Sequence, residues 1–355
     1  MIGNFSSKWR TASPQPCESL AAGFYHGGIS VITASRTANR MLRFTHMVQT
    51  LLANRNEYDV AIIDTFSTTA LHWAIFSAYI ARRLGKRVVL SLHGGNLLQR
   101  FDSQPEKITK HLRRANAIVS PSGYLADGFA SRGFTVQVIP NPIDWHSLPF
   151  RKREIVQPNA IWSRSFQGDV YNPQMAVRAL AHLCGQLPGA HLTMAGPDRG
   201  AETDTRQLAA KLNITEAIDF VGYLEKHNLL VKTDGCDIFL NTTRIDNMPV
   251  SVIESQAMGL CVVCTAVGGV PHLVTHEVDG MLVPSDDDEA MAAAVVRLVR
   301  DPDLAARISR NARARSEQYS WPKVFEMWKR LLSEITSKAK DNSTGQNANC
   351  SHGSS

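Results

Sequence analysis

A short stretch in the second half of the chain combines two carboxylates with the start of a helix. Asp246 and Glu254 flank Pro249, which suits the first turn of a helix because its missing N–H is not needed there. Gly259 suits the position after the last turn, so the sequence predicts a short helix from about residue 249 to 258. Free backbone N–H groups and the positive end of the helix dipole at this start are suited to binding a phosphate.

The two carboxylates admit a functional and a purely structural interpretation. Glu254 lies more than one turn into the helix, where it can reach a polar group beside a bound phosphate. In the structural alternative, Asp246 only caps the helix and Glu254 is a solvated side chain. A second feature favours a ligand. After the next apolar run, Gly268 and Gly269 form a turn where the backbone can approach a ligand closely.

Polar residues also follow apolar runs elsewhere in the chain. His93 is followed by Gly94 and Gly95, which suits a residue facing a cleft, although spacing alone does not identify a general base. Arg164 has a planar, permanently charged guanidinium that can bind two phosphate oxygens. For both residues the alternative is structural, as a hydrogen-bonded core histidine and a surface arginine. Asp64 also ends an apolar run, and no role is assigned to it.

Short apolar runs rich in Val and Ile recur along the chain, with room for one helix between neighbours. They are apolar throughout, as parallel strands covered on both faces should be. The runs lie at residues 29–33, 60–64, 87–92, 117–120, 136–139, 160–163, 191–195, 218–221, 237–240, 261–264 and 280–283. Predicted helices between them include 68–84, 172–184, 203–212 and 287–299. The sequence therefore predicts an α/β fold with two doubly wound, Rossmann-like domains facing each other across a cleft.

The chain divides near residue 145. The Pro-Asn-Pro stretch at 140–142 ends the first set of apolar runs, so we predict domains over residues 1–145 and 146–320. Large apolar residues recur every three or four positions in 321–335, which predicts a docked helix. Residues 336–355 have almost no apolar side chain and are predicted to form a disordered tail. The first five residues look like the end of a strand whose beginning is absent.

Composition and cysteine spacing exclude several classes of protein. The chain carries 38 Lys and Arg against 32 Asp and Glu, and aromatic residues make up 7%. It lacks the basic and aromatic stripe that is typical of nucleic-acid binders, so we expect no nucleic-acid partner. Cys261 and Cys264 lie in one apolar run and would face opposite sides of a strand, which argues against a shared metal or a disulfide.

Hydropathy predicts a soluble, cytoplasmic protein. No window approaches the 18 or more apolar residues of a membrane span, and the start lacks the apolar core of a signal peptide. The helix predicted around 70–83 is apolar in its body and basic at its end, which favours a core helix over a membrane-docking one and leaves open a peripheral contact with the inner face of a membrane. Two D-x-D segments, at 286–289 and 301–303, each precede a helix. Acids cap N–H groups at such positions, so we expect no metal there.

The order of motifs in the second half resembles the C-terminal half of the retaining nucleotide-sugar glycosyltransferases of family four, which have the GT-B fold. That family usually has an E-x7-E loop and helix, an apolar strand, and a Gly-Gly turn closed by Pro-Glu. Here Asp246 replaces the first glutamate, in the Asp-Asn-Met-Pro form of one branch of the family, and His272 replaces the last. The resemblance covers roughly residues 2–335.

The resemblance implies a metal-independent enzyme of the hexosyltransferase type that acts in polysaccharide biosynthesis without a cofactor. It would transfer a sugar with retention from a UDP-sugar or GDP-sugar to a glycan, lipid-linked or small-molecule acceptor. Glu254 would bind the ribose, Arg164 the diphosphate and Asp246 the hydroxyls of the donor sugar. Backbone N–H groups would complete the donor pocket around Asn247, Met248, Val250, Gly268 and Gly269.

The resemblance also assigns roles to the two domains. The first would hold the acceptor and the second the nucleotide sugar, with helix 321–335 crossing back to the first. His93 would lie near the transferred sugar, which makes it a catalytic candidate together with Arg164 and Asp246. Gly94, Gly95 and Asn141 would line the cleft on the acceptor side.

Alternatives of other classes stay open. A nucleotide-sugar epimerase can use the same architecture and needs no acceptor. A non-catalytic nucleotide-sugar-binding subunit would fit one departure from the family, which commonly places a lysine a few residues after the arginine. Segment 165–173 contains no lysine. A periplasmic sugar-binding protein also has two α/β lobes, but the expected lack of a signal peptide argues against it.

Overall fold

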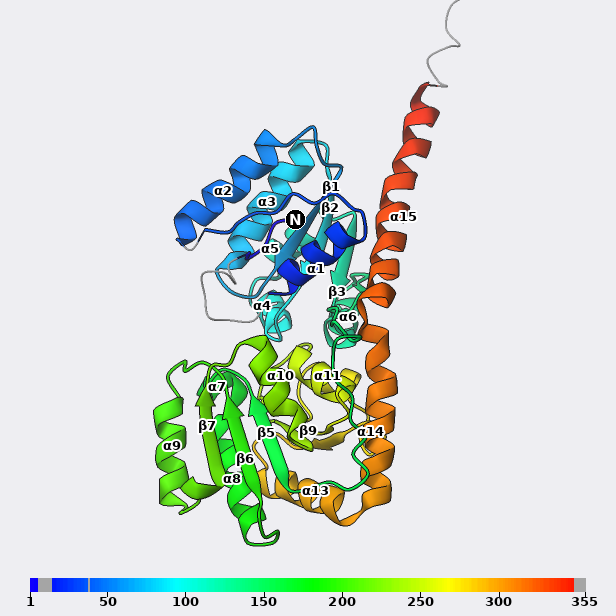
Figure 1. Ribbon diagram of the computed structural model, residues 1–355. Helices are drawn as coiled ribbons and strands as arrows, with labels where there is room; N and C mark the ends of the chain where they lie inside the picture. Colours follow the sequence, from blue (N-terminus) through cyan, green and yellow to red (C-terminus); the bar gives the residue numbers. More distant parts are fainter. Residues whose placement is uncertain (6–14, 38, 348–355) are drawn as a thin grey trace, which may run out of the picture.

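The computed structural model describes residues 1–5, 15–37 and 39–347. Two α/β domains lie one above the other, and the last two helices run along one side of the pair (Figure 1). Each domain is built around a parallel sheet. The predicted fold class of two doubly wound domains is therefore confirmed.

The first domain has a four-stranded parallel sheet in the order β1-β2-β3-β4. Its strands are β1 (Val60–Thr65), β2 (Arg87–Leu92), β3 (Ala117–Ser120) and β4 (Gln137–Val138). Its helices are α1 (Pro16–His26), α2 (Arg40–Ala53), α3 (Ala70–Arg83), α4 (Leu97–Ser103), α5 (Pro105–Leu112) and α6 (Gly123–Ala130). Alternate residues of β1 and β2 enter two apolar clusters, one under α2 to α6 and one under α1 and the C-terminal helix.

The strand predicted at residues 29–33 does not form. In its place the structure has one isolated bridge between Ala34 and Ile2, and Ile2 also bridges to Ile63 of β1. The run at 29–33 lies next to the segment around Ile2, and the two segments pair only through this isolated bridge, so no β-ladder forms between them. The run predicted at 136–139 likewise narrows to the two residues of β4.

The second domain has a six-stranded parallel sheet in the order β10-β9-β8-β5-β6-β7. Its strands are β5 (Asn159–Ser163), β6 (His191–Ala195), β7 (Ile218–Gly222), β8 (Ile238–Asn241), β9 (Cys261–Thr265) and β10 (Met281–Val283). Its helices are α7 (Gly168–Tyr171), α8 (Pro173–Cys184), α9 (Glu202–Lys211), α10 (Lys226–Asp234), α11 (Val250–Ala257), α12 (Val270–Leu273), α13 (Asp288–Arg300) and α14 (Pro302–Ser316). Cys261 and Cys264 enter opposite apolar clusters, so they face opposite sides of β9 as predicted from their spacing.

The C-terminal helix α15 (Trp321–Asn347) packs against the first domain. Val324, Trp328 and Leu331 are buried in the cluster that contains Phe24 of α1 and Val89 of β2. The prediction of a disordered tail from residue 336 is wrong as far as Asn347, because the helix continues through that residue. Once a helix is nucleated, each added residue gains a hydrogen bond without a new nucleation cost, so a polar sequence can extend it. Residues 348–355 lie outside the described part of the chain.

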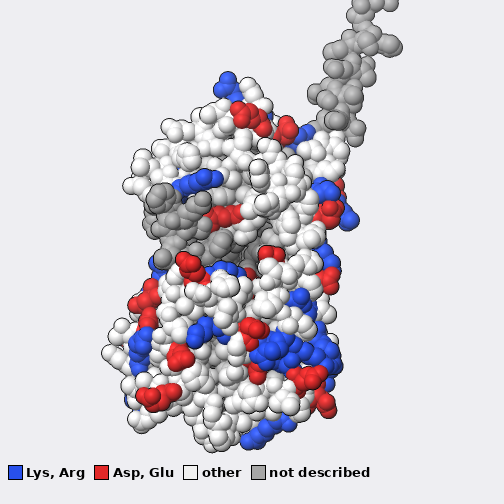
Figure 2. All heavy atoms as spheres, viewed as in Figure 1, with Lys and Arg blue, Asp and Glu red and all other residues white. Residues whose placement is uncertain are grey.

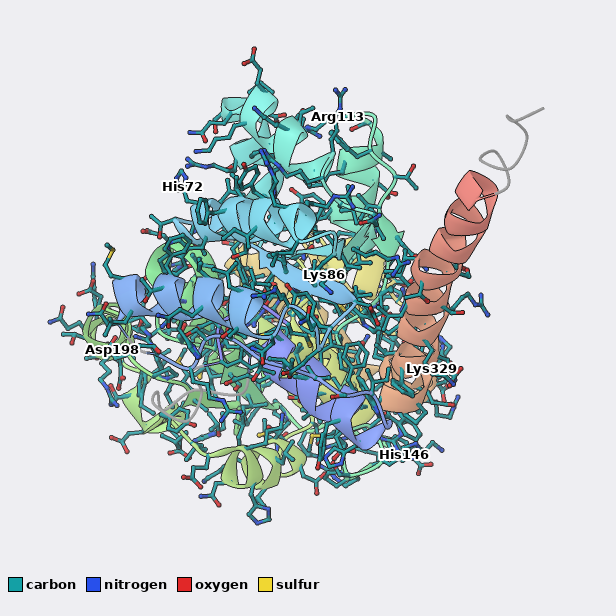
Figure 3. The ribbon with its side chains drawn as sticks, turned by 90° about the horizontal axis from the view of Figure 1, so that it is seen from above. His72, Lys86, Arg113, His146, Asp198 and Lys329 are labelled. Atoms are coloured by element: carbon teal, nitrogen blue, oxygen red, sulfur yellow. The ribbon has the colours of Figure 1, made fainter. Side chains whose placement is uncertain are left out.

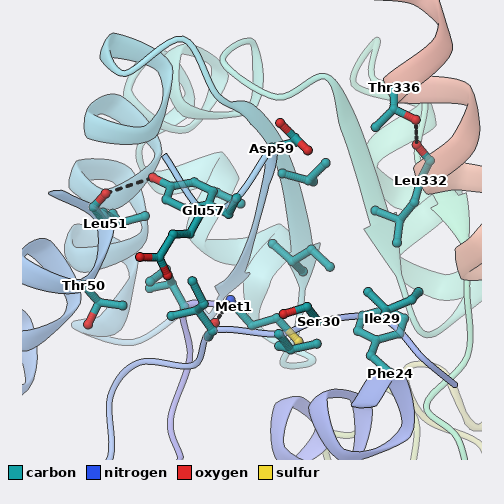
Figure 4. A pocket seen from close by; sticks show the side chains of 17 residues that line it. Met1, Phe24, Ile29, Ser30, Thr50, Leu51, Glu57, Asp59, Leu332 and Thr336 are labelled. Atoms are coloured by element: carbon teal, nitrogen blue, oxygen red, sulfur yellow. Dashed lines mark hydrogen bonds between the residues drawn. The ribbon is translucent and has the colours of Figure 1, made fainter. Parts of the chain in front are cut away.

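An apolar cavity of about 320 Å³ lies at the edge of the first sheet. It is bounded by Met1, the segment 29–32, the start of β1 at 60–62, and Leu332 and Thr336 of α15 (Figure 4). The amino end of β1 is the end of the sheet away from the second domain, so this cavity is separate from the candidate site described below. Among the residues that the structure describes, no helix combines the length and the apolar character needed to cross a membrane.

The packing of α15 gives a first prediction. Trp328 is 3% exposed and meets the ring of Phe24 edge-on at 5.7 Å between centroids. Trp328→Ala should lower the free energy of unfolding by about 3 to 5 kcal/mol, the usual cost of truncating a buried aromatic residue. Met327→Ala on the same helix is the control and should change it by less than about 1 kcal/mol, because Met327 is 37% exposed. Urea denaturation followed by circular dichroism measures both, and equal losses would contradict docking through this face.

Candidate functional site

The loop and helix that follow β8 have the predicted form. Helix α11 begins at Val250, directly after Pro249, and ends at Ala257. Gly259 then adopts a φ of 81°, a backbone conformation that side chains disfavour. The helix bounds agree with the sequence prediction to within one residue. The loop from β8 to α11, which carries Asp246, lies at the carboxyl edge of the second sheet.

Arg164 and Asp246 form an ion pair at this edge. The guanidinium also lies over the ring of Tyr171, at 4.9 Å from the centroid. Burial raises the pKa of Asp246, and both the charge of Arg164 and the N–H of Asn247 oppose that shift. The structure thus brings together two residues for which the sequence predicted separate ligand contacts. An anionic ligand at Arg164 must share this guanidinium with Asp246 or displace the carboxylate.

The glycine turn at Gly268 and Gly269 supports the loop directly. The N–H of Gly269 donates to the carbonyl of Asp246 at 3.1 Å, and a Cβ at Gly269 would lie 1.7 Å from the carbonyl oxygen of Asn247. A Cβ at Gly268, where φ is 51°, would lie 2.1 Å from the carbonyl oxygen of Asp246. Only glycine allows this approach without moving the loop.

Two N–H groups that were predicted to contact a ligand, those of Asn247 and Gly269, donate hydrogen bonds within the protein. The N–H of Asn247 donates to Oδ1 of Asp246 at 2.8 Å, and the N–H of Gly269 is used as described above. Both groups therefore have partners inside the protein. The physical reason is the tight packing of the loop against the glycine turn, which buries these groups and requires that they be paired.

The other residues of this loop that were predicted to line the donor pocket differ in their surroundings. The side-chain oxygen of Asn247 accepts a hydrogen bond from the hydroxyl of Ser122 in the first domain. Met248 is buried in the second core and lines a cavity of about 170 Å³ between the domains, together with His272. Val250 is half-buried in the first turn of α11.

His93 lies at the carboxyl end of β2 and is 7% exposed. Its Nε2 is 2.9 Å from the Ser91 hydroxyl and 3.4 Å from Oδ1 of Asp64. The imidazole stacks on Phe66 with 5.2 Å between ring centroids. The ring is thus held by neighbours within the first domain, and sequence spacing gave no signal for Ser91 or Phe66.

The turn after His93 contacts the second domain. A Cβ at Gly95 would lie 2.8 Å from Cγ2 of Ile245 and 3.3 Å from the carbonyl oxygen of Asp246. Gly94 has a φ of 91°. Asn141 shares with His93 a cavity of only about 10 Å³ that is lined by residues of the first domain and by Trp328 of α15, which is room for no more than a water molecule. The front surface is hollowed between the two domains (Figure 2).

Glu254 lies on α11 with its side chain 20% exposed and forms an ion pair with Lys226, the first residue of α10. No sequence motif connects Lys226 with Glu254. The rest of α10 and strand β8 lie between Lys226 and the helix that carries Glu254.

The acidic segments serve as helix starts, as predicted. Asp287 caps α13 through the N–H of Ala290, and Asp301 caps α14 through the N–H of Leu304. Asp286 is paired with Arg244. Within residues 1–5, 15–37 and 39–347, no group of three or more His, Cys, Asp or Glu side chains is arranged to hold a metal ion.

Two family models match the chain, one for each domain. Residues 164–315 match the glycosyl transferases group 1 model, and residues 9–146 match the Glycosyltransferase Family 4 model. Together the matched segments span about four fifths of the chain.

Curated relatives are similar over part of their length. A D-inositol 3-phosphate glycosyltransferase of Saccharomonospora viridis is 31% identical over 162 residues, which cover 43% of this chain and 38% of the relative. The protein of the same name from Corynebacterium efficiens is 24% identical over 255 residues, or 69% of this chain and 55% of the relative. The chain thus spans roughly two fifths to just over half of the length of these relatives.

Solved structures share the fold over most of the chain. HepE of Anabaena in complex with UDP has a TM-score of 0.72 and 17% identity, with 88% of each chain covered. Sucrose-phosphate synthase of Thermosynechococcus elongatus has a TM-score of 0.75 and 16% identity, over 95% of this chain and 98% of that one. The second domain thus matches the group 1 glycosyltransferases and the first matches Glycosyltransferase Family 4, and the chain shares the two-domain GT-B fold of the solved structures.

Proposed function

We propose that the chain transfers a sugar from a nucleotide diphosphate sugar to a hydroxyl group of a carbohydrate or lipid-linked acceptor, with retention. One observation carries the proposal. The paired Arg164 and Asp246 and the carboxylate of Glu254 lie at the carboxyl edge of the second sheet, and Gly95 of the first domain approaches the backbone of Asp246 there. Carboxyl edges of parallel sheets are where ligands bind in such folds.

The donor is proposed to be a UDP-sugar or GDP-sugar bound to the second domain. Glu254 accepts hydrogen bonds from the ribose hydroxyls, and Arg164 binds the diphosphate. When diphosphate oxygens take up the guanidinium, Asp246 is released to accept hydroxyls of the donor sugar. Support comes from the two matched family models and from HepE, which was crystallised with UDP and with UDP-glucose.

The reaction is proposed to proceed on one face of the sugar. The acceptor oxygen bonds to the anomeric carbon as the bond from that carbon to the phosphate oxygen breaks, and the acceptor proton passes to the leaving phosphate. Arg164 stabilises the charge that grows on the diphosphate. The two D-x-D segments are used as helix caps and ion pairs, which supports a metal-independent step.

The acceptor is proposed to bind in the first domain. A cavity of about 300 Å³ lies at the carboxyl end of β1, lined among others by Arg43, Asp64, Phe66 and Trp73. Aromatic faces and carboxylates are suited to sugar rings and hydroxyls. Asp64 also lines the small cavity that His93 and Asn141 line, so the proposed acceptor cavity lies beside His93.

A surface of the first domain is suited to peripheral membrane contact. We name it the α2–α3–α5 face, and it combines exposed Met41, Leu42, Phe76 and Tyr79 with basic Arg83, Lys107, Lys110 and Arg113. Helices α2 and α3 contain no acidic residue. Ring contacts from Phe44 to Phe76 and from Arg83 to Tyr79 join its parts. Viewed from above, labelled His72 and Arg113 point outward from this domain (Figure 3). Such a mixture favours an anionic bilayer surface.

Nucleotide binding tests the donor site. UDP or GDP should bind in calorimetry, and EDTA should leave the affinity unchanged. Glu254→Gln should weaken binding by about ten- to a hundredfold, because a charged acceptor for ribose hydroxyls contributes about 1.5 to 3 kcal/mol. Asp246→Asn should preserve or raise affinity for the bare diphosphate, because it frees Arg164, while transfer from the nucleotide sugar slows.

Four outcomes would contradict the proposal. Binding of neither nucleotide would remove the donor site, and equal loss of affinity in both variants would show that Asp246 only shapes the loop. Nucleotide binding without transfer or donor hydrolysis would favour the non-catalytic subunit, and a new sugar product from donor alone would favour the epimerase.

Vesicle binding tests the α2–α3–α5 face. The full chain should sediment with vesicles of phosphatidylglycerol and phosphatidylcholine, and much less with phosphatidylcholine alone. Lys107→Glu with Lys110→Glu should reduce binding by about tenfold or more, since each basic residue near an anionic surface contributes about 1 kcal/mol. Lys211→Glu with Lys232→Glu in the second domain makes the same charge change as a control. Equal loss in both pairs would contradict a specific face.

A further inference from the structure

The ion pair between Lys226 and Glu254 joins helices α10 and α11, which contribute to one apolar cluster. Both helices lie at the end of the second domain that faces the first (Figure 1). Leu229 and Leu230 of α10 pack against the cluster that contains buried Val252 and Ile253 of α11. The backbones that carry the two charges are therefore fixed relative to each other, and little ordering is needed to form the pair.

The two side chains are unequally exposed. The Glu254 side chain is 20% exposed, whereas that of Lys226 is 43% exposed. Glu254 is the partner with more to lose from desolvation, because a partly buried carboxylate needs a nearby positive charge or hydrogen-bond donors. The Lys226 ammonium supplies both at Oε2 of Glu254.

This contact leaves part of the carboxylate available. An ionised carboxylate has two oxygens that together accept about four hydrogen bonds. Lys226 contacts Oε2, so Oε1 remains for hydroxyl donors. A bound ribose can thus be accepted without breaking the ion pair. The ion pair also fixes the rotation of the carboxylate, which decides where its second oxygen points.

We propose that Lys226 is a positioning residue for ribose recognition, which it performs by orienting the carboxylate of Glu254. The inference rests on the proposed binding of a nucleotide at Glu254. It assigns a role to a lysine from another helix in a site whose segment 165–173, after Arg164, contains none. Lys226 acts through Glu254 and not through the reacting atoms.

The competing interpretation is that Lys226 blocks the ribose site and must leave before a nucleotide enters. The two interpretations predict opposite signs. A positioning residue strengthens nucleotide binding and makes it depend on the ribose hydroxyls. A blocking residue weakens binding, so its removal would raise the affinity.

The test compares a nucleoside diphosphate with its 2′-deoxy form on the full chain by calorimetry. UDP and 2′-deoxy-UDP serve as probes, or the guanosine pair if GDP binds more tightly. Wild type should prefer the ribose form by about tenfold, the usual scale for one hydrogen bond to a charged group. Lys226→Ala should weaken UDP binding by about tenfold and bring the preference for ribose close to one.

Matched variants separate positioning from general effects. Lys226→Arg should restore much of the ribose preference because it keeps the charge and a donor. Lys232→Ala removes an exposed lysine from the same helix and should leave both affinities unchanged. Thermal melting of each variant verifies that the fold is intact.

Either of two results overturns the inference while the donor site stands. Lys226→Ala could keep the wild-type ribose preference, or it could bind UDP more tightly than wild type. Failure of wild type to bind UDP and GDP overturns the proposed function and this inference with it, and that result is read from the wild-type titration alone.

Discussion

The structure depends on one packing constraint, the close approach of glycine turns to the loop that carries Asp246. Gly269 meets the backbone of Asn247 from within the second domain, and Gly95 meets Ile245 from the first. At neither position is there room for a Cβ without a shift of the neighbouring chain. The loop is thus held from two sides, and it is also the place where the domains touch.

That constraint brings opposite charges together in a partly buried place. Arg164 directly follows β5 and Asp246 lies in the loop after β8, and these strands are neighbours in the sheet. Burial alone would raise the cost of the Asp246 charge, and the guanidinium offsets it. The pair therefore holds the permanently charged guanidinium of Arg164 beside the carboxylate of Asp246 at the edge of the sheet. An arriving diphosphate would find the cation already positioned, with no need to order a flexible side chain.

The segment that leads into the C-terminal helix, together with the helix itself, packs against both domains. Tyr319, just before α15, packs in the core of the second domain, while Trp328 lies in the core of the first. The N–H of Ile143 in the inter-domain stretch donates to the carbonyl of Tyr319 at 2.9 Å. The chain therefore passes between the domains twice, near Ile143 and near Tyr319, and these two segments contact each other. The candidate site lies between the domains that they connect.

The sequence by itself determined the sheets and the helix of the site. Strands such as β2 and β6 were predicted with their observed bounds, because residues covered on both faces must all be apolar. The bounds of α11 followed from Pro249 and Gly259, which act locally. Tertiary structure decided the rest. The partners of Arg164 and Glu254 come from elements distant in the chain. The N–H groups of Asn247 and Gly269 donate hydrogen bonds to Asp246 because the loop packs against the glycine turn. Such contacts form when elements distant in the chain pack together, and local sequence patterns do not predict which elements will pack.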